Sequence, residues 1–133
     1  MSPASATASV FSQVVSGRNF AEYNLAAAVL IGAILNGADL SASVLSMADL
    51  SRADMRAANL QGADMRGVRM ERATLNGANL AGANLGPLES TQAPDRAWNS
   101  ALTHARFREA NLTGANLRGA DLKGASFEGA VLR

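Results

Sequence analysis

The sequence predicts an all-β fold in which the chain winds as a square coil around an apolar axis. Every fifth residue from Phe20 to Leu85 is apolar, and the residue two places before it is small at nearly every repeat, usually Ala. A five-residue step turns a helix by about 140°, so these apolar residues would scatter around its axis. In a flat strand, the same step sends successive members to opposite faces. A chain that turns a corner after every repeat buries the whole series, and four such sides complete one turn of the coil.

A second series of apolar centres follows in a shifted register. Its members are Leu102, Phe107, Leu112, Leu117, Leu122, Phe127 and Leu132. The separation of Leu85 and Leu102 is not a multiple of five, and the stretch from Gly86 to Arg96 is rich in turn-forming residues. We therefore expect an extruded loop between two tracts of one continuous domain. The predicted segments are an N-terminal cap (1–17), a first tract (18–85), the loop (86–99) and a second tract (100–133).

The triplets at the centre of each repeat resemble a known signature. Ala-Asn-Leu occurs at 78–80, 83–85, 110–112 and 115–117, and Ala-Asp-Leu at 38–40, 48–50 and 120–122. These triplets resemble the A-(D/N)-L-x-x motif of pentapeptide repeat proteins, over about 18–133 with the loop excepted. The resemblance implies that family's right-handed quadrilateral β-helix, here with about five coils. Arg18 and Tyr23 replace the small residue at the start, so we expect an irregular first coil.

Coils of four repeats place every fourth centre of a tract directly above the one before it. The predicted structural core includes Leu40, Leu60, Leu80, Phe107 and Phe127. Phe107 and Phe127 are expected to stack, and Arg108 can pair with Glu128. A polar ladder is expected outside, formed by Asn19, Asp39, Asn59 and Asn79. Most of the stability should come from the buried columns, because an exposed ion pair adds only about 0–1 kcal/mol.

The ends of such a coil expose backbone groups and apolar side chains, and they need a cover. The apolar residues of the N-terminal segment have the spacing of a short helix, which we expect to cap the first coil. Four apolar residues in outward positions imply a cover by this segment or by another subunit: Val29, Ile31, Ile34 and Val44. The repeat continues to Leu132, which predicts an uncapped C-terminal coil. That coil either pairs with another copy, as a homodimer or a stack, or it frays and is protected by charge.

Composition favours neither catalysis nor a metal or cofactor site. The 12 Lys and Arg residues balance 11 Asp and Glu residues, so a nucleic-acid partner is not expected. There is no Cys, and the single His, His104, is expected on the surface. Four carboxylates occupy the position where the repeat places Asn or Asp, and we interpret them as solvated ladder residues rather than as an acid–base pair: Asp39, Asp49, Asp54 and Asp64. We expect no enzyme activity and no cofactor.

The N-terminal stretch lacks the basic start and the continuous apolar run of a signal peptide. No stretch of the sequence is long enough and apolar enough to span a membrane. These observations predict a cytoplasmic protein.

Two groups of residues are candidate partner contacts. The first is a concentration of arginines within about one coil: Arg52, Arg56, Arg66, Arg69 and Arg72. They form either a mixed solvated face with the nearby carboxylates or a docking patch for an acidic partner. The second group lies in or beside the loop: Leu88, Arg96 and Trp98. Loops on rigid scaffolds often bind partners, although Trp98 can instead anchor the loop against the coil wall.

The function predicted from these features is a non-catalytic scaffold for protein–protein interaction. The resemblance adds an alternative, because some pentapeptide repeat proteins bind DNA gyrase and protect it from quinolones or related toxins. The projecting loop agrees with that alternative, whereas the net charge of +1 does not, because a mimic of duplex DNA should be strongly acidic. End-to-end assembly as a structural or effector protein is a third possibility. The sequence does not identify the partner.

Overall fold

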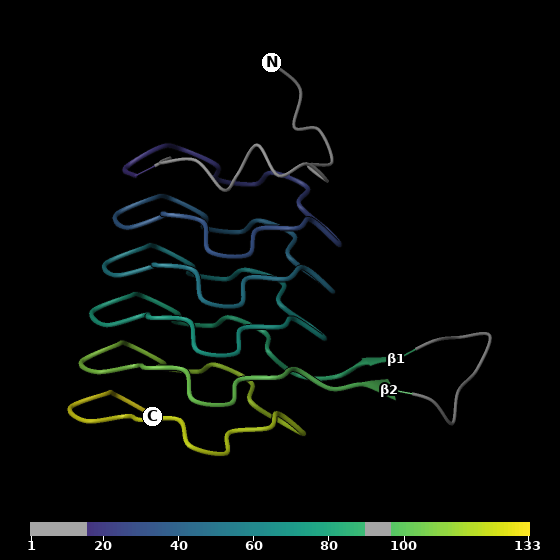
Figure 1. The fold of residues 1–133 in the computed structure, drawn as a ribbon, viewed down its shortest axis with the longest axis vertical. Helices are drawn as coiled ribbons and strands as arrows, with labels where there is room; N and C mark the ends of the chain where they lie inside the picture. The colour runs from purple at the N-terminus through teal and green to yellow at the C-terminus, as the bar shows by residue number, and fades with distance from the viewer. Residues whose placement is uncertain (1–15, 90–96) are drawn as a thin grey trace.

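The computed structural model describes residues 16–89 and 97–133. The backbone winds into coils that stack along the long axis of the molecule, from the N-terminal end to the C-terminal end (Figure 1). Parallel bridges join residues that are four repeats apart in the sequence, as between Asn19 and Asp39. The prediction that such residues lie above one another is therefore confirmed, and each coil has four sides.

We name the four sides by their ladders of bridged residues. Face A carries Asn19, Asp39, Asn59, Asn79, Asn111 and Val131. Face B carries Asn24, Val44, Asp64, Asn84 and Asn116. Face C carries Val29, Asp49, Arg69, Ala101 and Asp121. Face D carries Ile34, Asp54, Thr74, Arg106 and Ser126.

The insertion leaves the coil at the corner between faces B and C. The next bridge after it joins Arg69 to Ala101, so the chain returns to the face that it would have entered and the four faces are preserved. Its two ends form strands that the sequence did not predict, β1 (Leu88–Glu89) and β2 (Ala97–Trp98). The strands pair antiparallel, with Leu88 opposite Trp98, and project sideways from the stack (Figure 1).

Each corner is a tight turn with one residue in the left-handed region. At the first corner, the N–H of Tyr23 donates to the carbonyl of Phe20 at 3.1 Å, and the second central residue, Glu22, has a φ of 62°. A positive φ at this place defines a type II turn and favours Gly. The backbone therefore explains why Gly recurs two residues after the apolar centre, as at Gly62 with a φ of 68°.

The Asn and Asp residues of the ladders have a structural role that the sequence analysis did not foresee. The side-chain oxygen accepts a hydrogen bond from the backbone N–H two residues later, as from Ala81 to Asn79 Oδ1 at 3.0 Å. The same bond joins Ser41 to Asp39 at 3.0 Å. An Asx side chain can thus satisfy a corner N–H that no coil neighbour reaches.

The apolar centres and the small residues before them form the core. Leu40, Leu60, Leu80 and Phe107 are buried, and Phe127 is half-buried. The rings of Phe107 and Phe127 are parallel within 2° with centroids 4.9 Å apart, which confirms the predicted stack. Fewer residues are buried in the last described coil. Among the described residues, that coil has a neighbouring coil on only one side.

Two expectations were wrong. The first coil has a regular backbone despite Arg18 and Tyr23, because the N–H of Phe20 donates to Asp39 and the carbonyl of Arg18 accepts from Asp39. The ladder needs only backbone groups, so it tolerates larger side chains at this end. In the described part of the chain, Arg108 and Glu128 form no ion pair.

The predicted cap spans residues 1–17, of which residues 1–15 lie outside the described residues. Ser16 and Gly17 form a turn. Within residues 16–89 and 97–133, no helix has the length and apolar character needed to cross a membrane.

Candidate functional site

Two of the candidate arginines are neutralised by carboxylates of their own coil. Arg56 donates from Nε to Asp54 Oδ1 at 2.8 Å and from Nη2 to Oδ2 at 2.7 Å. Arg66 binds Asp64 through the same two bonds, each 2.8 Å long. These hydrogen bonds lower the pKa of both carboxyl groups below the ordinary value of 3.8. The guanidinium groups of Arg56 and Arg66 are therefore already paired with a carboxylate.

The other three arginines have weaker partners or none among the described residues. Arg69 lies 3.7 Å from Glu71, with both side chains exposed. Arg52 and Arg72 form no ion pair there. They occupy the corner between faces C and D, at φ values of 61° each, in successive coils.

The structure does not bring the five arginines together in one patch. Arg69 belongs to the ladder of face C, whereas Arg56 follows the centre of face D and Arg66 follows that of face B. A five-residue step moves the chain to the next face, so residues close in the sequence diverge around the coil. A docking patch made of all five arginines has no counterpart in this geometry.

The hairpin holds the loop candidates Leu88 and Trp98 at its base. Trp98 is 38% exposed, and Leu88 is half-buried. The hairpin lies directly against Gly67, where a Cβ atom would be 3.2 Å from the Trp98 carbonyl and 3.4 Å from the Leu88 Cβ. Gly67 thus allows a close approach that fixes the hairpin to the coil. Arg96 lies outside the described residues.

The outward apolar residues are distributed over several faces. Val29 and Ile31 lie on face C and at its following corner, with 43% and 48% of their surface exposed. Ile34 lies on face D and Val44 on face B, and both are half-buried. Val29, Ile31 and Ile34 therefore follow one another around one corner of the coil, whereas Val44 lies on face B.

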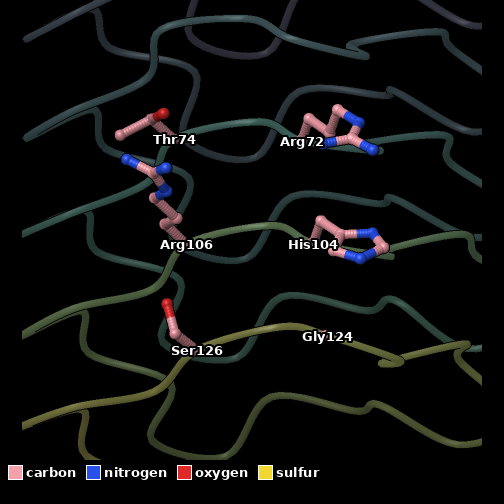
Figure 2. Close-up of a pocket in the computed structure, with 6 residues that line it drawn as sticks. All are labelled: Arg72, Thr74, His104, Arg106, Gly124 and Ser126. Carbon is pink, nitrogen blue, oxygen red and sulfur yellow. The ribbon is translucent and has the colours of Figure 1, made fainter.

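The structure also shows a hollow that the sequence analysis missed. It has a volume of about 470 Å³ and is lined by Arg72, Thr74, His104, Arg106, Gly124 and Ser126. Figure 2 shows two parallel columns: Arg72, His104 and Gly124 occupy one corner, and Thr74, Arg106 and Ser126 belong to the ladder of face D. We call it the corner groove.

The sequence contained only a partial signal for the corner groove. His104 and Gly124 are four repeats apart and could be aligned, whereas the insertion separates Arg72 from His104. That alignment required the length of the insertion, which the repeat period alone does not give. His104 is exposed, as expected.

Among residues 16–89 and 97–133, no three His, Asp or Glu side chains gather in an arrangement suited to a metal ion. The features that the structure does present are a regular coil, a hairpin fixed on it and a polar groove. Together they define a repetitive β-solenoid.

This chain belongs to the pentapeptide repeat family. The family model for pentapeptide repeats matches eight copies, over residues 24–62, 53–86 and 99–133. The family recognised from the triplets is confirmed, and with it the right-handed β-helix. None of the curated proteins with which the chain was compared matches it.

Several solved structures of pentapeptide repeat proteins are similar. HetL, involved in heterocyst differentiation regulation in the cyanobacterium Nostoc sp. strain PCC 7120, is 33% identical over 89% of this chain, with a TM-score of 0.44. The chain spans 60% of the length of HetL. The protein alr5209, also from Nostoc, is 30% identical, with 87% of this chain and 85% of that chain covered and a TM-score of 0.38.

A trypsin-treated form of QnrB1, a plasmid-mediated fluoroquinolone resistance protein, is 19% identical with a TM-score of 0.52. The match covers 96% of this chain and 72% of that chain. At this identity, the likeness supports the fold.

Proposed function

We propose that this protein is a non-catalytic scaffold of about five coils that acts in the cytoplasm and presents its hairpin to a protein partner. The observation that carries the proposal is the position of Trp98, which is 38% exposed on a hairpin fixed to the coil. Trp is enriched among the residues that dominate binding energy at protein interfaces. A projecting element on a rigid support also binds with a smaller loss of conformational entropy.

The apolar surface around the hairpin extends beyond Trp98. Met47 is 37% exposed, and its Sδ lies 2.7 Å from where a Cβ of Gly67 would be. The side chains of Met47 and Leu88 and the backbone carbonyl of Trp98 therefore meet around Gly67. An apolar centre of this kind, bordered by the ion pair of Arg118 and Glu89 at 3.2 Å, has the arrangement of an interface core with a polar rim.

A non-catalytic role is supported by the use that the coil makes of its carboxylates. Asp49 accepts the N–H of Ser51 at 3.1 Å, and Asp54 and Asp64 bind both a backbone N–H and an arginine. Carboxylates engaged in this way stabilise corners and ion pairs. A general acid or base instead needs access to a substrate and a pKa near the working pH.

The experiment compares which partner proteins are captured by three forms of the protein: the wild type, Trp98→Ala, and Val131→Ala. Val131 is 41% exposed, so it serves as an apolar control of similar exposure in the last described coil. We expect a partner that is captured by the wild type and by Val131→Ala but is lost with Trp98→Ala. The partner is then identified by mass spectrometry and titrated, as a purified protein, against all three forms by calorimetry. Equal affinity for all three would exclude the hairpin as the contact.

The alternative of DNA gyrase binding has one supporting observation, the projecting hairpin on the shared fold. The similar QnrB1 is a fluoroquinolone resistance protein, whereas this chain carries a net charge of +1. A supercoiling assay with gyrase and a fluoroquinolone separates the two proposals. If this protein restores supercoiling by gyrase in the presence of the fluoroquinolone, the gyrase-directed function is supported instead of the general scaffold.

End-to-end assembly is supported by the last described coil. The N–H groups of Leu117, Leu122 and Phe127 have no backbone acceptor among the described residues, and Leu132 is 58% exposed. Unpaired edges of this kind can pair with another chain. Sedimentation velocity over a range of micromolar concentrations tests the idea, and a constant monomeric mass would exclude it.

A further inference from the structure

The polar side chains of the corner groove differ from the ladder Asn and Asp residues and from the paired arginines in having no partner among the described residues. Elsewhere, Asn and Asp side chains of the ladders bind backbone N–H groups, and Arg56 and Arg66 bind carboxylates. In the groove, the side chains of Arg72, His104 and Arg106 form no ion pair or hydrogen bond in the described part of the chain. The same holds, among the described residues, for the hydroxyl groups of Thr74 and Ser126.

The charge of the groove is not balanced by its neighbours. Asp54 lies directly before Thr74 in the face D ladder, but both of its oxygens bind Arg56. Glu71 follows the centre of face C and is directed to Arg69 at 3.7 Å. Arg52 adds a further cation above Arg72 at the same corner. Like charges stacked on successive rungs repel one another, and a bound anion would relieve this repulsion.

The shape of the groove provides room for such an anion. The His104 ring lies over Gly124, 2.6 Å from where a Cβ would be, and the groove leaves an open volume of about 470 Å³ beside these side chains. Ser126 is short, so the lower end of the groove is open beneath Arg106. Figure 2 shows the guanidinium of Arg106 directed up toward Thr74, with Arg72 and His104 one above the other beside it. Guanidinium and hydroxyl groups that line the same hollow can bind the oxygens of a phosphate group.

We propose that the corner groove binds a phosphate-type oxyanion, either a free phosphate ester or diphosphate or the phosphate of a phosphorylated side chain. Arg72 and Arg106 supply the charge, and Thr74 and Ser126 supply neutral donors. This site is separate from the hairpin, so it does not depend on the scaffold function proposed above.

His104 is the only histidine in the chain, so its Cε1–H signal in a proton NMR spectrum reports on the groove without labelling. Inorganic pyrophosphate is titrated at fixed pH and constant ionic strength. We expect a saturable shift of this signal with half-saturation at about 1 mM, as for a few charge-assisted hydrogen bonds. A shift that grows linearly without saturation would overturn the proposal.

Three variants locate the contact. Arg106→Gln and Arg72→Gln should each weaken binding by about tenfold or more. Arg18→Gln removes the same charge from an exposed arginine of the first coil that forms no ion pair among the described residues, and it should leave the affinity unchanged. An equal loss in all three variants would show attraction by net charge alone and would overturn the site. Unchanged circular dichroism confirms that each variant is folded.

A second arm distinguishes the source of the phosphate. A peptide containing phosphoserine is compared with pyrophosphate and with the same peptide lacking the phosphate. Tighter binding of the phosphopeptide assigns the groove to a phosphorylated protein, and preference for pyrophosphate assigns it to a small molecule. Binding of the unphosphorylated peptide with equal affinity would contradict a phosphate site. None of these outcomes depends on Trp98, so failure here leaves the hairpin proposal intact.

Discussion

The middle of the coil and its last described turn contain the same repeat but bury it to different extents. Leu60 and Leu132 belong to the same inner column of face A, yet Leu60 is fully buried and Leu132 is 58% exposed. Phe107 and Phe127 differ in the same direction, although their rings stack. Neighbouring coils on both sides therefore determine how much a repeat residue contributes, because each coil forms part of the core of the next.

The largest test of this comparison is truncation of the inner column. Leu60→Ala should lower the free energy of unfolding by about 2–5 kcal/mol, because it leaves a cavity between two coils. Leu132→Ala should change it by less than about 0.5 kcal/mol, because the side chain is mostly in solvent. Urea unfolding followed by circular dichroism measures both. Equal losses would show that the last coil is as well packed as the middle.

The second test uses two glycines at the corner between faces B and C. Gly67 and Gly119 have φ values of 68° and 70°, so Ala costs about 1–2 kcal/mol of backbone strain at either position. At Gly67, the new Cβ would also meet the Met47 side chain at 2.7 Å and the Trp98 carbonyl at 3.2 Å, whereas at Gly119 it would meet only the Asn99 side chain, at 3.0 Å. A side chain moves more easily than a backbone in a packed site.

We therefore expect Gly67→Ala to lower the free energy of unfolding by about 1 kcal/mol more than Gly119→Ala does, because the new methyl group overpacks the hairpin base. Thermal unfolding gives the difference in stability, and the fluorescence of Trp98 reports whether the hairpin has shifted. A Gly67→Ala protein with unchanged fluorescence and the stability of Gly119→Ala would contradict the close contact.

The third test concerns the Asx hydrogen bonds. Asp64→Ala should cost about 1 kcal/mol, because the N–H of Arg66 and its guanidinium both lose an acceptor in a half-buried position. Asp64→Asn keeps one acceptor for the N–H of Arg66, so it should lower the free energy of unfolding less than Asp64→Ala does. In the last coil, Asp121→Ala removes an exposed bond of 3.1 Å to Lys123 and should cost less than about 0.5 kcal/mol. Chemical denaturation ranks the three variants, and an Asn variant as unstable as the Ala variant would assign the effect to charge.

The smallest test is the pH dependence of stability. Hydrogen bonds from Arg56 and Arg66 lower the pKa of Asp54 and Asp64 in the folded state. Their contribution is therefore complete above the ordinary carboxyl pKa of 3.8 and is lost as the pH falls through the lowered folded-state pKa. Between pH 7 and pH 2, the melting temperature of the wild type should fall further than that of the double variant Asp54→Asn/Asp64→Asn. Parallel curves would mean that these pairs contribute nothing.

Much of the fold could be predicted from residues such as Leu60 and Ala58, because an inward side chain every five residues is a local property of a chain that turns at regular corners. The role of Asp64 was only partly predicted. Its place on the outside followed from the period, but its bond to the N–H of Arg66 depends on the corner conformation. The candidate sites were harder, because Arg66 and Arg69 are close in the sequence and lie on different faces.

The sequence by itself determined the period, the inward and outward positions, the break after Leu85 and the family to which the chain belongs. The tertiary structure decided which side chains from distant repeats meet. Arg72 lies above His104, and Thr74 above Arg106, because the insertion leaves the coil and returns without changing the faces. A repeat specifies where each side chain points along its own coil, whereas the stacking of coils specifies its neighbours. The corner groove and the hairpin contact at Gly67 are both products of that stacking.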